Sequence, residues 1–528
     1  MKKIYLCLCI FAVFAVSPIL FADEEDSAGW TSRPQKKRIA EPGPDPTSPV
    51  RDLETPLQDV AYIPNSILES PYAVYADNSM VTLEQLSTEL AALKKELKQK
   101  ADKPDPKKGF TTPKIGGHVL MDSVNVMKQN TDSDEAYGHG MNNFGFREVR
   151  MKASGTGYGF LDYKCDLGYE KWASIPPTTP AATPGSSSSL GGVSFKDVFL
   201  GAEGIPLFGY LRIGNQYVED ASSEVCAAPT AYTFMEIPSP AGNQLTARRL
   251  GITSRHLFHN DQLRFFTGVY GARSVSDMHT ILDSNQGVTT LARLTYAPWY
   301  VNEGQCMFLL GGYYNYTDYC GEKTKNYVYP GGFAVGINTL DSGYFTCDNY
   351  QKVGGEFLWQ YYGFAIQGEM FAQYFNNAGS TTPPPDGFVR DGDKTSKGGY
   401  VMLRQFLTPG DYRKYSKENA TWGTAHVSRN FMSIDRGSFY CLEGPGAWEI
   451  ATCLGVINNE DFANNTPRCP YGTDYELGLA LNWYWNTQTR WSLNYIRQMS
   501  DVRVVTPAGT QHYKPATDIL GLSCRFFF

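Results

Sequence analysis

Beyond its first residues the sequence lacks any long apolar run, so no transmembrane helix is available and a membrane could be entered only as a closed barrel. It also lacks an excess of positively charged residues. Because the formal net charge is -7, we expect no nucleic-acid partner. Only 7 histidines occur, without HExxH or GxSxG, so the sequence predicts no catalytic residues and no enzyme. No CxxC occurs, and His256 and His259 have no third ligand nearby, so no metal or cofactor is expected.

Aromatic residues are abundant instead, with 34 Tyr and 29 Phe, and this composition favours strands. Of 11 cysteines, Cys7 and Cys9 lie in the N-terminal segment, and the odd remainder cannot pair completely within one chain. We expect a few disulfides in loops, with Cys165 and Cys524 acting as small apolar residues on strand faces.

The N-terminal region divides into four segments. Residues 1–22 carry Lys2 and Lys3, an apolar stretch and a final Ala22, which predicts a secretory signal peptide; Leu20 keeps an uncleaved anchor as the alternative. Residues 23–80 are rich in Pro, Asp, Glu and Ser and predict a disordered spacer. Residues 81–102 predict a short coiled-coil helix for oligomerisation, or a helix lying on the rest of the protein. Residues 103–114 form a Pro-containing linker. The leucines of the helix stripe are Leu83, Leu86, Leu90, Leu93 and Leu97.

From residue 115 to 528 the sequence predicts a transmembrane antiparallel β-barrel of about sixteen strands, an all-β fold. Short turns alternate with long loops, as in outer-membrane barrels, except that the long stretch 409–445 falls on the short-turn side and has no physical explanation in the sequence. The expected strands are 115–127, 144–155, 159–170, 193–203, 209–216, 248–257, 262–271, 289–297, 305–317, 351–362, 364–374, 398–408, 446–456, 474–486, 490–500 and 518–528.

Alternation within these strands separates two faces. In YELGLALNWYW (475–485) Leu479 and Trp483 share an apolar face, and Glu476 and Asn482 lie on the other. A soluble sandwich would show the same alternation with the apolar face inside. The final segment ILGLSCRFFF has apolar residues at every second position and no polar tail after Phe528, which favours apolar residues facing lipid and charged residues facing a wet lumen.

Several segments resemble the phosphate-selective porin O/P family of bacterial outer-membrane porins: FREVRMKASG (146–155), FKDVFLGAEG (195–204), YLRIGNQYVE (210–219), TFMEI (233–237), RRLGI (248–252), GAWEIATCLGV (446–456) and LGLALNWYWNTQTRWSLNY (477–495). The resemblance covers roughly 110–528. It implies a trimer of sixteen-stranded barrels, each with a pore narrowed by the third extracellular loop. It also implies that FLTPGDYRKY, which opens 409–445, has a counterpart in the family.

Charges on the expected lumen face are balanced. The basic pore-wall residues are Arg150, Lys152, Lys164, Arg212, Arg249, Arg255, Arg293, Arg490 and Arg525. The acidic ones are Glu148, Asp162, Asp166, Glu170, Asp197, Glu203, Glu369, Glu449 and Glu476. The third loop (217–247) supplies the expected pore constriction, formed by Glu219, Asp220, Glu224 and Glu236.

This acidic constriction predicts passive diffusion of small hydrophilic solutes and ions, mildly cation-preferring or non-selective. Alternatively the acids pair with wall arginines such as Arg249 and Arg255, or the pore selects phosphate or other anions. The expected partners are outer-membrane lipid, two further copies in a homotrimer, and the barrel-assembly machinery through Phe528. The spacer, expected in the periplasm, leaves open a cell-wall contact and a purely structural, tethered barrel.

Overall fold

The computed structural model describes residues 73–76, 79–82, 109–140, 142–170, 193–242, 246–272, 287–319, 324–330, 338–380, 389–435, 438–441, 443–462, 470–506 and 509–528. The expected signal peptide, residues 83–102 of the expected coiled coil with its leucines, and nearly all of the expected spacer lie outside these residues, whereas residues 81–82 belong to strand β2. The chain divides into two units, residues 1–91 and 92–528. In the first, β1 (Ala73–Ala76) and β2 (Ser79–Thr82) form an antiparallel hairpin.

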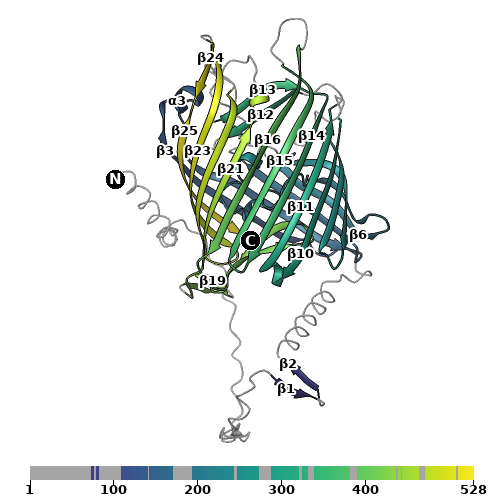
Figure 1. Ribbon diagram of the computed structural model, residues 1–528. Coiled ribbons are helices and arrows are strands. Elements are labelled where there is room, and N and C mark those ends of the chain that lie inside the picture. The colour runs from purple at the N-terminus through teal and green to yellow at the C-terminus, as the bar shows by residue number, and fades with distance from the viewer. Residues whose placement is uncertain are drawn as a thin grey trace, which may run out of the picture. The chain divides into compact units, whose positions relative to one another are not determined.

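The second unit is a closed antiparallel β-barrel, and in the described residues 16 strands make up its wall (Figure 1). The wall strands are β3 (Lys114–Gln129), β4 (Asn143–Gly157), β5 (Leu161–Glu170), β6 (Val193–Ile205), β7 (Gly209–Tyr217), β8 (Arg248–Phe258), β9 (Leu263–Gly271), β10 (Val288–Val301), β11 (Cys306–Asp318), β14 (Asn349–Tyr361), β15 (Phe364–Ser380), β16 (Val389–Phe406), β21 (Ala447–Asn458), β22 (Tyr471–Tyr484), β23 (Thr489–Thr506) and β25 (Ala516–Phe527).

Each wall strand overlaps one of the strands expected from the sequence, so the predicted fold class is confirmed. The ends differ because several strands continue past the predicted limits. The expected strand 398–408, for example, is β16, which extends its pairing with β15 to Ser380↔Val389 through register shifts. Three strands that the sequence did not predict lie at the end of the barrel that carries the long loops, called here the loop end: β12 (Thr324–Pro330), β13 (Asn338–Thr346) and β24 (Gly509–Tyr513).

Alternation places apolar side chains on the outside of the wall, as predicted. On β22, 47% of Leu479 and 44% of Tyr475 is exposed, whereas Glu476 is 6% exposed and Asn482 is 0% exposed. Large apolar side chains in contact with water would be costly. An outward apolar belt over a closed wall therefore suits a lipid surround, in which every backbone group must be paired within the protein.

The barrel closes between its first and last wall strands. β25 pairs with β3 from Thr517↔Gln129 to Phe527↔His118. Phe528 then exchanges two backbone hydrogen bonds with Gly117, at 2.9 and 3.1 Å. Closure leaves no free sheet edge, which a strand in lipid could not satisfy.

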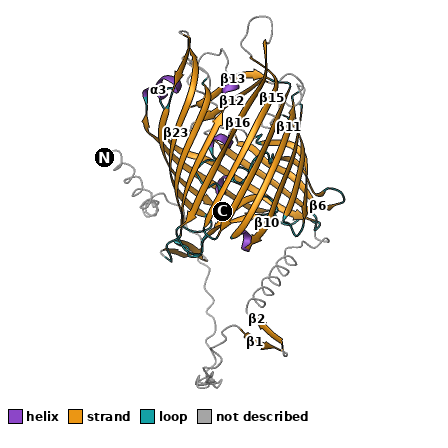
Figure 2. Cartoon of the chain, viewed as in Figure 1, coloured by secondary structure: helices purple, strands orange, loops and turns teal. Residues whose placement is uncertain are grey.

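Helices are short in the described residues (Figure 2). They are α3 (Thr131–Tyr137), α4 (Ser239–Gly242), η4 (Pro229–Ala231), η5 (Asn302–Gly304) and η6 (Glu460–Phe462). None of the described helices has the length and hydrophobicity needed to cross a bilayer.

Among the described residues, free thiols are found at Cys165, Cys226, Cys306, Cys453 and Cys524. Cys320 and Cys469 lie outside the described residues, and the side chain of Cys441 is not described, so the expected loop disulfides stay a prediction.

The stretch 409–445, unexplained by the sequence, folds into two hairpins. β17 (Tyr412–Ser416) pairs with β18 (Thr421–His426), and β19 (Met432–Asp435) pairs with β20 (Ser438–Cys441). The segment connects β16 to β21 at the end of the barrel that carries the short turns, called here the turn end, where Figure 1 places β19. The first hairpin is strongly buried: Tyr415 and Trp422 are each 3% exposed.

Candidate functional site

The third long loop, residues 218–247 between β7 and β8 and called L3 below, crosses the lumen. Near its start Glu219 contacts Arg264 on β9, and farther along the carbonyl of Met235 accepts a hydrogen bond from Arg525 on β25. β9 and β25 are separated around the wall by β3 to β8 on one side, so L3 spans the interior instead of following one stretch of wall.

Inward wall side chains hold the backbone of L3. Carboxylates accept from its amides: Glu369 from Ser222 at 3.0 Å, Glu356 from Ser223 at 2.6 Å and Glu476 from Ser239 at 3.2 Å. Arginines donate to its carbonyls: Arg490 to Tyr232 at 2.5 Å, and Arg525 to Phe234 at 3.1 Å. A loop inside a barrel must find partners for its backbone groups, and the charged wall supplies them.

L3 also packs an apolar core within the lumen. Val225, Phe234 and Met235 join inward residues of the wall, including Phe371 and Met402, in one buried cluster. Inward apolar side chains on β15 and β16 would be unfavourable against water, and L3 covers them. This half of the lumen is therefore packed like a protein interior.

The four L3 acids expected to form the constriction all have partners. Glu219 lies 2.8 Å from Arg264 and 3.4 Å from Arg293, and Glu236 lies 2.7 Å from Arg147. Asp220 accepts from Asn315 at 2.9 Å and from Thr246 at 2.5 Å, with the ammonium of Lys352 at 4.0 Å. Glu224 accepts from the amide of Thr233 at 2.6 Å and from Gln367 at 3.0 Å, with Arg413 at 3.5 Å.

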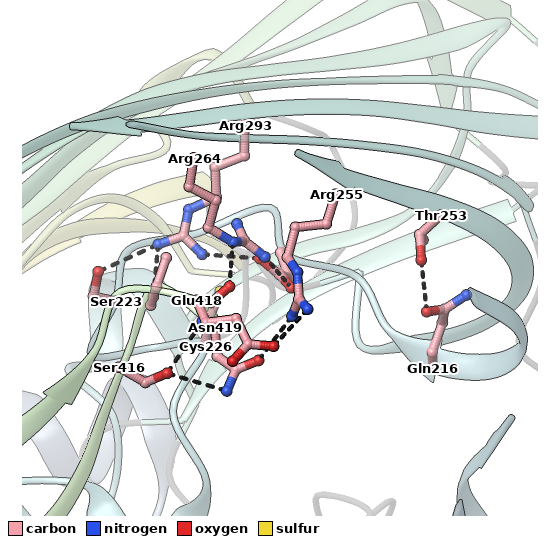
Figure 3. Close-up of polar contacts among 12 residues, drawn as sticks. Gln216, Ser223, Cys226, Thr253, Arg255, Arg264, Arg293, Ser416, Glu418 and Asn419 are labelled. Atoms are coloured by element: carbon pink, nitrogen blue, oxygen red, sulfur yellow. Dashed lines mark hydrogen bonds and ion pairs between the residues drawn. The ribbon is translucent and has the colours of Figure 1, made fainter. Parts of the chain in front are cut away.

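From the turn end, the β17–β18 hairpin enters the lumen and meets a row of three arginines on β8, β9 and β10. Arg255 contacts the carboxylate of Glu418 at 2.5 Å, and Arg264 donates to the Glu418 carbonyl at 2.8 Å. Arg293 donates to the carbonyl of Ala420 at 3.2 Å. Figure 3 shows the three guanidinium groups reaching from neighbouring strands toward the hairpin tip. The forked donors of arginine suit this mixture of carboxylate and carbonyl acceptors.

The hairpin is also fixed to wall residues on β10, β14, β15 and β16. The Trp422 ring lies 3.7 Å below the Arg404 guanidinium, and its indole N–H donates to Gln367 at 2.6 Å. Gln360 donates to the carbonyl of Arg413 at 2.8 Å, and Tyr300 donates to the carbonyl of Tyr415 at 2.7 Å. The hairpin thus has wall contacts that do not involve L3.

L3 and the hairpin meet inside the barrel. Arg413 pairs with Glu224 and donates to the Thr233 hydroxyl at 2.5 Å, and the hydroxyls of Tyr415 and Ser223 lie 2.9 Å apart. Burial alone would raise the pKa of Glu224, but Arg413 and then Arg404 hold it below its ordinary value. Burial alone would lower the pKa of Arg413, and Glu224 holds it above its ordinary value. Both groups are therefore charged at neutral pH.

Five of the 16 wall strands, β4 to β8, keep part of their lumen face accessible, and this region is called the accessible half below. Lys164 lies 2.6 Å and Arg248 lies 2.7 Å from Asp197, with 26%, 21% and 15% of these side chains exposed. Arg212 stacks on Phe199 at 4.0 Å and is half-buried. Among partly or fully exposed charges described on these strands, the basic outnumber the acidic: Arg147, Lys152, Lys164, Lys196, Arg212, Arg248 and Arg249 against Asp162, Asp197 and Glu203.

The predicted wall residues divide between the two halves. On β4 to β8, Lys152, Lys164, Arg212 and Arg249 are partly or fully exposed, whereas Arg150 and Arg255 are buried. Arg255, Arg293, Arg490 and Arg525 are 7%, 0%, 1% and 0% exposed and contact the hairpin or L3.

Sequence reasoning missed several charged residues of the lumen. Strand alternation was a sufficient signal for Arg264, Lys352, Glu356 and Arg404, which share the inward face with predicted neighbours. No periodic signal existed for Arg413 and Glu418, because they belong to the inserted segment. The described residues contain no cluster of three or more His, Cys, Asp and Glu side chains arranged to hold a metal ion.

Comparison with known proteins gives one family and several similar solved structures. The family model for phosphate-selective porin O and P matches residues 116–526. No curated protein matches the chain. Among solved structures, the trimer form of OmpT from Vibrio cholerae is 12% identical over 80% of this chain and 100% of its own, with a TM-score of 0.40. The anion-selective porin of Comamonas acidovorans is 12% identical over 79% and 100%, with a TM-score of 0.41. OmpF of Salmonella typhi is 12% identical over 79% and 97%, with a TM-score of 0.42.

Proposed function

The chain belongs to the phosphate-selective porin O and P family, and from that membership we propose that it is a pore of the bacterial outer membrane for passive diffusion of small hydrophilic solutes and ions. The observation that carries the proposal is the contrast within the lumen: L3 and the β17–β18 hairpin cover one half, and charged side chains of β4 to β8 stay accessible in the other. A wall of sixteen strands is too wide for its own side chains to fill.

Solutes pass along the inner face of β4 to β8. The support for this route is the partial exposure of Lys164, Asp197 and Arg248, which lie on β5, β6 and β8. Charged groups placed there need water or ion partners, since an empty apolar interior would make their burial very costly.

Selectivity in this proposal follows the accessible wall and not the acids of L3. Because Glu219, Asp220, Glu224 and Glu236 have partners among wall and hairpin groups, they contribute little unbalanced negative charge. The basic excess on β4 to β8 favours small anions modestly over cations. The anion preference, an alternative left open by the sequence, is thus better supported than the mild cation preference.

The proposed oligomeric state also rests on membership of the porin family. We propose a homotrimer, with the outward apolar belt in contact with outer-membrane lipid and with neighbouring copies. Recognition of Phe528 by the barrel-assembly machinery, a periplasmic location for the N-terminal spacer and a cell-wall contact of the spacer belong to the proposal as well.

Planar-bilayer recording tests the function. Purified full-length protein should add discrete conductance steps, and in a potassium chloride gradient the reversal potential should have the sign expected for a chloride preference. A folded barrel that adds no current would refute the pore. A current with a cation-preferring reversal potential would retain the pore and overturn the proposed selectivity.

A further inference from the structure

The constriction loop L3 shares its contacts with a segment that enters from the opposite end of the barrel. Of the four L3 acids, Glu219, Asp220 and Glu236 lie near cations of the wall, on β9, β10, β14 and β4. Glu224 differs because its ion-pair partner, Arg413, comes from the β17–β18 hairpin. Glu224 is 2% exposed, so its charge depends strongly on that partner.

Around this ion pair the two segments share further contacts. Arg413 spans L3 by pairing with Glu224 and donating to Thr233, so it ties together two positions nine residues apart. The Tyr415 hydroxyl contacts Ser223 at 2.9 Å. Ala227, Ala231 and Tyr232 of L3 pack in the same buried cluster as Tyr415 and Trp422. The contact is therefore both charged and apolar.

The hairpin is itself anchored to the wall at this point. Its tip is held by the arginine row, and Trp422 is held by Arg404 and Gln367. A segment fixed to several wall strands can restrain a loop that touches it, because moving the loop would leave a buried charge and buried hydroxyls without partners.

We infer that the β17–β18 hairpin positions the constriction: Arg413 and Tyr415 hold L3 in one place and thereby keep the bore of the pore constant. The inference rests on the proposed function for its electrical readout. It adds to that function the residues of a hairpin that enters from the turn end, whereas L3 originates at the loop end. Arg413 and Tyr415 act through L3 and do not touch the solute.

Single-channel noise tests the inference. Arg413→Gln should give open-channel current noise severalfold above that of the wild-type protein, with transitions between sublevels, because L3 is released from one of its supports. The matched control is Lys414→Gln: Lys414 is the next residue of β17 but pairs with Glu303 at a partly exposed site, and this variant should be as quiet as wild type.

In a second pair of variants each substitution removes only a tyrosine hydroxyl, so the packing of the ring is preserved. Tyr415→Phe loses the contact to Ser223, whereas Tyr412→Phe changes a ring that packs against His426 within the hairpin. The first variant should be noisy and the second quiet. If Arg413→Gln does not form a heat-modifiable barrel, Tyr415→Phe decides the outcome.

A double-mutant cycle between Glu224 and Arg413 distinguishes a positioning role from a general loss of stability. Glu224→Gln and Arg413→Gln should each raise the noise, and the double variant should be quieter than either, because it leaves neither charge buried alone. Noise equal to wild type in folded Arg413→Gln and Tyr415→Phe would overturn the inference. Noise in the Lys414→Gln control as high as in Arg413→Gln would overturn it as well.

Thiol labelling gives a readout that needs no current. Cys226 lies on L3, with its thiol against the carbonyl of Ala221. Labelling of the Cys226 peptide by a small maleimide should be severalfold faster in Arg413→Gln than in wild type and unchanged in Lys414→Gln. An unchanged labelling rate in Arg413→Gln would refute the positioning role, whether or not the wild-type protein conducts ions. If the wild-type protein conducts no ions but labelling is faster in Arg413→Gln, only the pore function is refuted.

Discussion

The two halves of the lumen wall carry the same pattern of inward charges, but these charges are buried against L3 and the hairpin in one half and partly exposed in the other. On the covered half, Arg293, Glu356 and Arg490 are 0%, 6% and 1% exposed and bind the backbone or side chains of L3 and the hairpin. On the accessible half, Lys164 and Arg248 pair with Asp197 at positions that remain partly open. A charged inward face is thus a scaffold where the chain covers it, and it is the proposed solute path where the chain leaves it open.

The difference has an energetic consequence. A charge pair in the covered half is stripped of water, so losing one partner leaves the other buried and uncompensated. A pair in the accessible half is screened by water and salt, and its loss costs little. Equivalent substitutions in the two halves should therefore have unequal effects on folding and unequal effects on conduction.

The largest effect is expected for Arg293→Met, which keeps much of the side-chain volume but leaves Glu356 and Glu219 without this cation. The barrel should lose about 3–5 kcal/mol of unfolding free energy. Urea unfolding in lipid vesicles, followed by tryptophan fluorescence, measures the loss. The matched change in the accessible half, Arg212→Met, should cost less than about 1 kcal/mol; equal losses would contradict the division of the lumen.

Charge removal in the accessible half should alter selectivity most. A unit charge about 4 Å from a passing ion changes its energy by about 1 kcal/mol in water. The double variant Lys152→Gln and Arg212→Gln should therefore lower the anion-to-cation permeability ratio by about fivefold at low salt. Reversal potentials measure the ratio. Arg503→Gln removes one positive charge at the loop end of β23, where Arg503 lies opposite His512 of β24, and should leave the ratio unchanged.

Acid should loosen the covered half only at low pH. Because the folded pKa of Glu224 lies below its ordinary value of 4.5, the stabilisation from its charge is complete above that value and is lost as pH falls through the lowered folded pKa. Open-channel noise should stay flat from about pH 7 down to pH 4.5 and rise only below it. Glu224→Gln should abolish the acid-dependent rise; a rise at neutral pH in the wild-type protein would contradict the assignment.

The smallest effect is expected for Asp197→Asn in the accessible half. Asp197 pairs with Lys164 and Arg248, and all three side chains are partly exposed, so the unfolding free energy should fall by about 1 kcal/mol or less. The difference from wild type should shrink as salt is added, because salt screens exposed pairs. A loss that persists in high salt would indicate that this pair is as dehydrated as the covered ones.

Much of the fold was predictable because the strands of a lipid-facing wall carry a local pattern, the alternation of apolar and polar residues. The alternation in residues 475–485 was sufficient to place Leu479 outward and Glu476 inward, and the same rule located each wall strand. Strand ends were less accurate because β15 and β16 continue into the loops through register shifts, which no periodicity indicates.

The candidate site was predictable only in part. Phe371 and Met402 are inward apolar residues, a signal that something covers β15 and β16, but the signal does not say which segment does so. The four L3 acids were found from the sequence, yet their partners lie far away in the chain, such as Arg413 for Glu224. The route along β4 to β8 follows from where L3 and the hairpin lie, and their positions depend on these distant contacts.

The amino-acid sequence by itself determined which side chains face lipid and which face the lumen, because a period of two residues assigns each side chain of a strand to one face whatever surrounds it. Only the tertiary structure decided which inward charges meet water. An arginine such as Arg293 or Arg212 has the same local pattern in either case, and the difference lies in whether residues from L3 and the β17–β18 hairpin, remote in sequence, come to rest against it.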